Sequence, residues 1–321
     1  MTTATPAIIR LGRVTSTQAV AWALAGEGAP DGTVVVADTQ TAGRGRHGRT
    51  WLDEPGASLL ASYLMRPRLD PARLPTLSLA AAVAVAETLE GVTGLHPRLK
   101  WPNDVLVRGR KIAGILLESR LDGSSGRAEP LAPLVAGAAC PPRDVGGLFQ
   151  KRGAPTPPAD ALASGAARSS NSPPSVRGDP TPLAPIVIIG VGINLAQSSF
   201  ADGLAARATS VRLEGAATPD REAMLRALSE ALERWRRRLE SEGFGPVRSR
   251  WRSLAESLGR PVTVDGVSGV AVDVDDTGAL VVEADGRRHT VVSGELEESG
   301  MESAPRGPAG ESRGGRSPRR P

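Results

Sequence analysis

Short apolar runs and one alanine-rich segment predict the strands and the first helix in the part of the chain up to residue 189. Residues 33–37 and Ser58–Met65 are short and rich in aliphatic side chains, which predicts buried strands, and residues 186–189 have the same character. Residues 77–89 are rich in Ala and Leu and contain no Gly or Pro, so we expect a helix that ends before Gly91. Strands mixed with helices in this way indicate an α+β domain.

A second helix is predicted after Thr218, which can cap its N-terminus, with Pro219 at the first helical position. Apolar residues then fall on one stripe, namely Leu225, Leu228, Leu232, Trp235 and Leu239. Four arginines gather near the C-terminal end: Arg234, Arg236, Arg237 and Arg238. They could form a nucleic-acid surface, but a solvated helix face is the favoured interpretation because the helix dipole attracts cations there.

The pattern changes after Gly259 to short apolar runs at residues 262–264, 270–274, 280–283 and 290–292. The runs are separated by the dipeptides Asp265-Gly266, Thr277-Gly278 and Asp285-Gly286, which are typical of hairpin turns. A small β-barrel attached to the α+β domain is therefore expected.

Two segments have compositions that do not predict a packed fold. Residues 121–185 hold 12 of the 27 prolines and show no sustained apolar period, so we expect a disordered insertion. Residues 303–321 hold five Arg and one Glu, which accounts for the whole net charge of +4 and leaves 34 basic and 34 acidic groups elsewhere. This tail is also expected to be disordered, and the excess charge is no argument for a nucleic-acid partner.

Several classes of protein are disfavoured. The single Cys140 excludes a disulfide framework, and the three histidines show no metal-ligand spacing. No signal peptide and no run of about 18 apolar residues is present, so we expect a cytoplasmic protein without membrane association.

An unusual loop alternates glycine with arginine between Gly43 and Arg49. It formally matches G-x-G-x-x-G, but Pro55 follows too soon for the helix that a dinucleotide fingerprint must open. A flexible basic connection is the simple alternative. Backbone amides and guanidinium groups this close together favour a loop that orders around an anion.

Lysine is rare, since the chain has only Lys100, Lys111 and Lys151 beside 36 arginines. A lysine kept in such a chain is a candidate for a site that needs a compact ammonium. Lys100 begins KWPNDV and Lys111 begins KIAGILLE, and the two segments predict a hairpin. The later GVGINL, which begins at Gly190, indicates either ligand approach or tight sheet packing.

Taken in order, Ser16-Thr17-Gln18, GRGRHGRTW, KWPNDV, KIAGILLE and GVGINL resemble the biotin protein ligases, the biotin–[acetyl-CoA-carboxylase] ligases, over residues 10–120 and 186–297. The resemblance implies a catalytic domain over residues 1–258 with a fold like class II aminoacyl-tRNA synthetases, a mixed sheet with flanking helices. It also implies an SH3-like barrel over residues 259–298.

The implied activity has two steps. Biotin and MgATP form biotinyl-5′-AMP and pyrophosphate, and a lysine of a biotin carboxyl carrier domain of an acyl-CoA carboxylase then attacks the mixed anhydride. Joining a carboxylate to a phosphate requires fixed cations more than a nucleophilic side chain. The arginine loop, Lys100 and Lys111 can supply these cations.

The resemblance also implies residue roles. The biotin-contacting positions are Ser16, Thr17, Gln18, Gln40, Arg44, Gly45, Arg46 and Lys100. The nucleotide-contacting positions are Arg46, Arg49, Trp51, Asn103, Asp104 and Lys111. Lys100 would bridge the biotin carboxyl and the adenylate phosphate, Arg46 would contact that phosphate, and Asp104 is the candidate Mg²⁺ ligand. Family members often have Asn where this chain has Gln18.

Two alternatives stay open. A lipoate ligase shares the fold and the adenylation chemistry, although KWPND and GRGRHGRTW favour biotin. A nucleic-acid-binding module could use the arginine-rich helix and the tail. Because only 15 residues precede Ser16, we expect no N-terminal DNA-binding domain and no operator binding. A homodimer is possible, and removal of residues 122–181 should leave adenylate synthesis within a few-fold.

Overall fold

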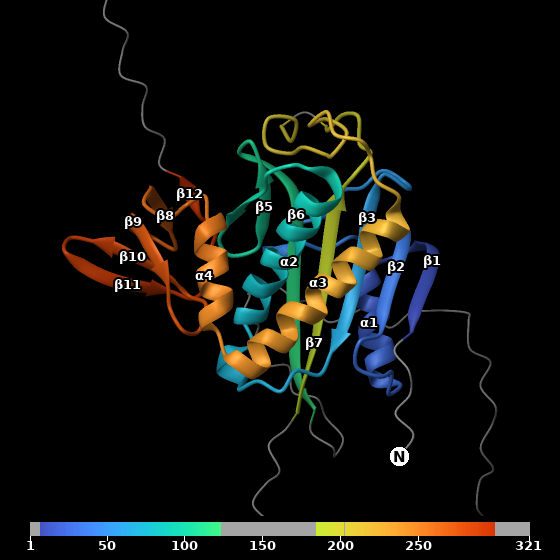
Figure 1. Ribbon diagram of the computed structural model, residues 1–321, viewed down its shortest axis with the longest axis horizontal. Helices are drawn as coiled ribbons and strands as arrows, with labels where there is room; N and C mark the ends of the chain where they lie inside the picture. Colours follow the sequence, from blue (N-terminus) through green and yellow to red (C-terminus); the bar gives the residue numbers. More distant parts are fainter. Residues whose placement is uncertain (1–6, 123–183, 202, 299–321) are drawn as a thin grey trace, which may run out of the picture.

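The structure is a computed structural model that describes residues 7–122, 184–201 and 203–298 (Figure 1). A large seven-stranded sheet has the order β1-β2-β3-β7-β6-β5-β4, and a smaller sheet has the order β11-β10-β9-β8-β12. Only the β1–β2 pair of the large sheet is parallel. Its strands are β1 (Ile8–Val14), β2 (Val34–Gln40), β3 (Ser58–Met65), β4 (Arg98–Lys100), β5 (Asp104–Val107), β6 (Arg110–Asp122) and β7 (Ala184–Asn194).

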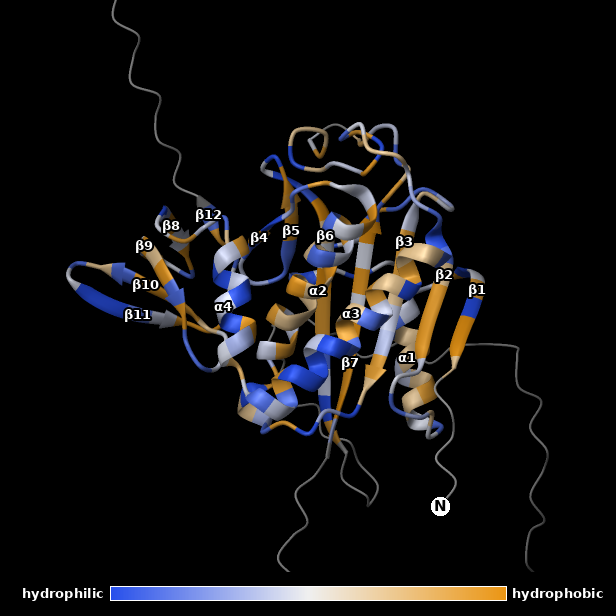
Figure 2. Ribbon diagram, in the orientation of Figure 1, coloured by the Kyte–Doolittle hydropathy of each residue, from blue (hydrophilic) through white to orange (hydrophobic). Residues whose placement is uncertain are grey.

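Helices cover both faces of the large sheet, as Figure 1 shows. On one face lie α2 (Thr76–Thr93), α3 (Arg221–Glu242) and α4 (Gly245–Leu254), packed on side chains such as Tyr63 and Ile189. On the other face α1 (Thr17–Gly26) packs on Leu64 and Ile188. Neighbouring residues of β3 and β7 thus enter different cores, which is why these strands read as continuous apolar runs. In Figure 2 both strands show apolar stretches in orange, with paler stretches between them.

The strand predictions are confirmed in position and corrected in length. Ser58–Met65 matches β3 in full, whereas β2 runs to Gln40 and β7 runs from Ala184 to Asn194. β6 and β7 also extend two residues into each end of the 121–185 segment that was predicted to be disordered, ending with the pair Asp122–Ala184. The rest of that segment, and the tail at 303–321, lie outside the described residues.

Both predicted helices exist with different ends. The α2 helix continues through Gly91 because a glycine can be tolerated inside a well-packed helix, and it stops at Gly94, whose φ of 70° forms a left-handed C-cap. The wider stretch Pro71–Thr93, which includes α2, is long and apolar enough to cross a membrane by length and composition alone. However, 67% of its most apolar part is buried in the protein. It therefore reads as a core helix.

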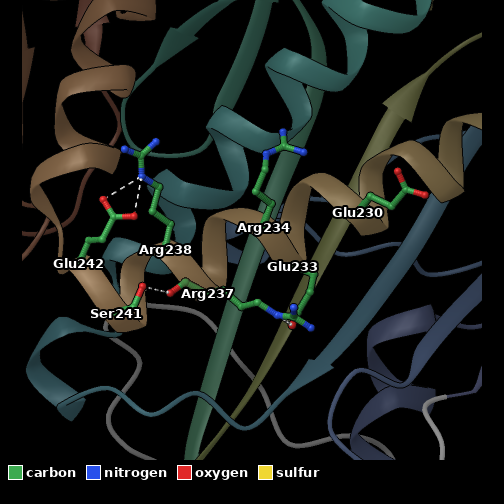
Figure 3. Close-up of a pocket in the computed structure, with 7 residues that line it drawn as sticks. All are labelled: Glu230, Glu233, Arg234, Arg237, Arg238, Ser241 and Glu242. Carbon is green, nitrogen blue, oxygen red and sulfur yellow. Dashed lines mark hydrogen bonds and ion pairs between the residues drawn. The ribbon is translucent and has the colours of Figure 1, made fainter.

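The predicted cap of α3 is wrong. The helix starts at Arg221, and the Asp220 carboxylate accepts from the Ala223 amide at 2.9 Å, which places the cap two residues after Thr218. The arginines near the other end of α3 pair with carboxylates. Arg237 pairs with Glu233 at 2.5 Å and Arg238 with Glu242 at 3.1 Å, as Figure 3 shows. Neighbouring carboxylates therefore balance the charges of these arginines.

The predicted small β domain is present as an antiparallel sheet of β8 (Pro261–Val264), β9 (Val267–Val274), β10 (Leu280–Ala284), β11 (Arg287–Val291) and β12 (Glu297–Glu298). Asp265 and Gly266 have φ of 48° and 76°, and the Asp285-Gly286 turn is similar, as hairpin turns require. The buried Trp101 indole donates to the Gly278 carbonyl at 3.0 Å, which joins the small domain to the KWPND turn.

Candidate functional site

A cavity of about 870 Å³ opens over the middle of β6 and β7. Its walls come from the N-terminus of α1, the arginine loop, the β4–β5 turn, Phe200, residues 204–208 and residues 294–297. Every predicted site residue lines this one cavity: Ser16, Thr17, Gln18, Gln40, Arg44, Gly45, Arg46, Arg49, Trp51, Lys100, Asn103, Asp104 and Lys111. The structure therefore brings together segments that lie far apart in the sequence, from Ser16 to Lys111.

Glycines form the floor of the cavity because side chains from other segments lie directly on them. A Cβ at Gly192 would be 2.6 Å from the Trp51 ring, and one at Gly114 would be 2.9 Å from the same ring and 3.1 Å from Lys111 Nζ. At Gly190 an added Cβ would collide with the Gln18 amide. The glycines of GVGINL thus lie against side chains of the site, which neither of the two interpretations specified.

One corner of the cavity is a buried group of hydroxyls and carboxamides. The Thr17 amide donates to Gln40 Oε1 at 2.8 Å, and the Thr17 and Ser62 hydroxyls are 2.8 Å apart. The Gln18 side chain donates to the Leu116 carbonyl at 3.4 Å. Because Ser16 and Thr17 begin α1, the helix start and β2 together place these groups at one end of the cavity.

The first arginine of the loop is tied to β6 by an acidic residue with no role in the sequence prediction. Arg44 Nη2 lies 3.2 Å from Glu118 Oε2, and the same oxygen accepts from the Trp22 indole at 2.6 Å. Glu118 is visible in the sequence as the end of KIAGILLE, but nothing there indicates that Trp22 and Arg44 meet on it. It joins the loop to α1, which carries Thr17.

The second arginine crosses the cavity toward the small domain. Arg46 Nη1 donates to Asn103 Oδ1 and to the Gly294 carbonyl, each at 3.3 Å, while its Nε is buried with no hydrogen-bond partner in the described part of the chain. Burial lowers the pKa of the Arg46 guanidinium to about 10, so it stays charged at neutral pH. Arg49 pairs with Glu295.

The two lysines differ in their partners. Lys111 Nζ is 2.6 Å from Asp104 Oδ1 and 5.7 Å from the centre of the Trp51 ring. Lys100 is half-buried at the end of β4, and among the described residues no hydrogen bond or ion pair engages its ammonium. Within the same residues there is no group of three or more acidic, histidine or cysteine side chains that could hold a metal ion.

Sequence reasoning missed two walls of the cavity. One is the segment after β7 that contributes Phe200, Leu204 and Arg207, and the other is the segment that contributes Gly294 and Leu296. Their charged and glycine residues, such as Arg207, Gly294 and Glu295, are not concentrated in a motif like that of the arginine loop, and each segment reaches the cavity through long-range packing. No local signal could have found them.

A mixed-sheet α+β domain, a cavity lined by arginine and lysine side chains and a small antiparallel domain are together what the class of biotin and lipoate protein ligases would require. Residues 11–128 match the biotin/lipoate A/B protein ligase family, and residues 257–297 match the biotin protein ligase C-terminal domain. More particularly, the chain belongs to the biotin protein ligase family.

Individual relatives agree with this placement. The chain is 30% identical over 295 residues to the biotin–[acetyl-CoA-carboxylase] ligase of Paracoccus denitrificans, covering 89% of this chain and 98% of the relative. It is 30% identical to the bifunctional ligase/repressor BirA of Bacillus subtilis, covering 88% and 71% of the two chains. The fold is similar to biotin protein ligase from Aquifex aeolicus in complex with biotin and ATP, with a TM-score of 0.64, 24% identity and coverage of 91% and 99%.

Proposed function

We propose that the protein is a biotin protein ligase that joins biotin to ATP, forming biotinyl-5′-AMP and pyrophosphate, and then transfers biotin to a lysine of a biotin carboxyl carrier domain. The observation that carries the proposal is the meeting of a buried carboxamide and hydroxyl corner with the cations of the loop and the two lysines in one cavity. Family membership and the named relatives support the same activity.

The chemistry needs positioning and charge. A carboxylate oxygen of biotin attacks the α-phosphorus of ATP, the bond to the β-phosphate oxygen breaks, and pyrophosphate leaves. The acceptor amine then attacks the acyl carbon, and AMP leaves with the electron pair. Both steps bring anionic oxygens together, so fixed cations lower the barrier more than a protein nucleophile would. Arg46 and Lys100 are the cations assigned to the reacting carboxyl and phosphate.

Biotin is assigned to the corner made by Ser16, Thr17, Gln18 and Gln40. Its ureido ring has donors and acceptors within an otherwise apolar body, and such a ligand needs a few convergent polar groups in a closed pocket. Arg44 and Gly45 would close over its carboxyl end. On the other side, the Trp51 ring and Asn103 are assigned to the nucleotide.

Magnesium is assigned to the nucleotide phosphates, with Asp104 as the candidate protein ligand. Mg²⁺ is often held by one or two carboxylates together with substrate phosphates and water, so a single acidic residue in the cavity fits this chemistry. The Asp104 carboxylate is 2.6 Å from Lys111 Nζ, and it would have to be shared between the two. When bound, the ion would neutralise charge on the leaving pyrophosphate.

We further infer a catalytic domain over residues 1–258 that is similar to class II aminoacyl-tRNA synthetases, followed by an SH3-like barrel over residues 259–298. The mixed seven-stranded sheet and the five-stranded antiparallel sheet support this division. The acceptor would be the carrier domain of an acyl-CoA carboxylase in the cytoplasm. The compensated charges on α3 favour a ligase without DNA binding over the nucleic-acid alternative, and a homodimer remains compatible with the proposal.

Exchange of labelled pyrophosphate into ATP, run with biotin or with lipoate, tests the first step. Exchange that depends on biotin supports the proposal. Exchange that occurs with lipoate but not with biotin would instead indicate a lipoate ligase. Lys100→Ala and Lys111→Ala should then be compared for the KM of biotin and of ATP. If Lys111→Ala raises the KM of biotin and Lys100→Ala does not, then Lys111 and not Lys100 is the lysine that contacts the biotin carboxyl.

Transfer to a carrier domain tests the second step. Wild-type protein with biotin and ATP should label the carrier, whereas Arg46→Ala should not label it at a comparable rate. Exchange without transfer would mean that the acceptor is a different protein.

A further inference from the structure

A buried carboxylate lies behind the cavity wall, outside the residues assigned to the reaction. The Glu214 side chain is 0% exposed, and its Oε1 accepts from Arg110 Nη2 and from Thr209 Oγ1, each at 2.7 Å. Arg108 Nη1 lies 3.6 Å from the other carboxylate oxygen. Burial of an acidic group is costly unless it is paired and hydrogen-bonded, so the two contacts at Oε1 hold Glu214 in place, while Oε2 is buried with no hydrogen bond among the described residues.

The groups that Glu214 binds lie on both sides of Lys111. Arg110 directly precedes Lys111 in β6, and Thr209 belongs to a short segment that pairs with the Lys111 backbone. The Lys111 amide donates to the Arg207 carbonyl at 2.8 Å, and the Thr209 amide donates to the Lys111 carbonyl at 2.9 Å. One carboxylate thus joins the two backbone segments that meet at Lys111.

The other side of Lys111 is irregular. Between β5 and β6, Val105 lies opposite Ala113 but Leu106 lies opposite Lys111, so Ile112 is an extra residue in the ladder. A bulge of this kind disrupts local pairing and redirects side chains. The direction of the Lys111 side chain therefore depends on the pairing with residues 207–209 that Glu214 secures.

We propose that Glu214 is a positioning residue for adenylate formation, acting by fixing the Lys111 backbone so that its ammonium lies at Asp104 and beside Trp51. This inference rests on the proposed function, in which Lys111 contributes a cation to the nucleotide site. The same carboxylate also holds Thr209, next to the cavity wall formed by Arg207 and its neighbours.

A double-mutant cycle on full-length protein tests the inference, with the rate of biotin-dependent pyrophosphate exchange as the readout. Glu214→Gln keeps the shape and can still accept from Thr209, but it loses the charge that pairs with Arg110. We expect an exchange rate about tenfold lower, as coupled neighbours commonly show. In a Lys111→Ala background the same change should alter the rate less than about twofold.

A tenfold loss in both backgrounds would show a general structural role and would overturn the inference, as would wild-type activity in Glu214→Gln. If the wild-type protein itself gives no biotin-dependent exchange, the proposed function fails instead. The two failures are therefore distinguishable.

Two arginines of the same turn provide a matched control. Arg110→Gln removes the 2.7 Å contact and should reproduce the loss, including its dependence on Lys111. Arg108→Gln makes the same charge change at a side chain that is 77% exposed and 3.6 Å away, so it should stay within about twofold of wild type. Equal losses in both variants would overturn the inference. If Glu214→Gln does not fold, the double-mutant cycle of Arg110→Gln with Lys111→Ala tests the same inference.

Discussion

Replacing Gly192 with alanine should displace Trp51 from the cavity floor. A Cβ at this position would be 2.6 Å and 2.7 Å from two atoms of the indole ring. Carbon atoms in contact are normally about 3.5–4.0 Å apart, so the ring must move by about 1 Å. Gly192 lies in the central strand β7, opposite Gly114 of β6, so the backbone cannot yield easily.

The displacement should appear in nucleotide binding more than in stability. Trp51 is half-buried and can swing outward, so we expect Gly192→Ala to cost no more than the roughly 1–3 kcal/mol typical of overpacking. A misplacement of about 1 Å in a positioning group can cost up to about 100-fold in rate. With Trp51 assigned to the nucleotide, the KM of ATP in pyrophosphate exchange should rise about tenfold or more.

Two comparisons make this prediction refutable. Gly12→Ala introduces a methyl group in edge strand β1 with nothing within 4 Å, and it should leave the KM of ATP unchanged. In a Trp51→Ala background, Gly192→Ala should have little further effect because the clash is gone. An unchanged KM of ATP in Gly192→Ala, or a full effect without the indole, would refute the assignment of Trp51.

Three further predictions concern stability and chain organisation. Trp101→Phe leaves the Gly278 carbonyl without its buried donor and should lower the free energy of unfolding by about 1–3 kcal/mol, measured by denaturant titration. Asp220→Ala should cost about 1 kcal/mol in the same titration, whereas Thr218→Ala should cost much less, because Asp220 is the cap that accepts from the α3 backbone. Replacing residues 123–183 with Asn-Gly should leave exchange within a few-fold, because Asp122 and Ala184 already face each other as a strand pair. A large loss in that last assay would show that the segment contributes to the site.

The elements predicted best are those with a two-sided apolar environment. β3 was predicted to the residue because every position from Ser58 to Met65 is buried, so the apolar run ends where the strand ends. β1 was not predicted, since it is an edge strand with several exposed residues and, among the described strands, it pairs with β2 alone. The α3 start was misplaced because Thr218 and Asp220 are both good caps, and only tertiary packing selects between them.

The residues of the site also differ in how far the sequence predicts them. Residues in dense motifs, such as Arg46 and Lys111, could be predicted because charge and glycine are concentrated in few positions there. The contacts that orient them could not. Glu118 meets Arg44 across 74 residues, and Gly294 meets Arg46 across 248. Such pairs depend on how β6 and the small domain are placed, which no local pattern records.

The cations of the cavity differ in the protein partners that they already have, and this difference indicates which of them would gain most from contact with the adenylate. Arg44 and Lys111 already have carboxylates at 3.2 Å and 2.6 Å, so the protein balances part of their charge before an anionic ligand binds. Among the described residues Arg46 donates to two neutral oxygens at 3.3 Å, so an anionic ligand would supply a counter-charge that these partners lack. Since Lys100 has no partner among the described residues, it gains most from an incoming phosphate or carboxylate. Electrostatics thus favours Arg46 and Lys100 as the proposed contacts of the reacting carboxyl and phosphate, while Arg44 and Lys111 share their charge with Glu118 and Asp104 beside the ligand.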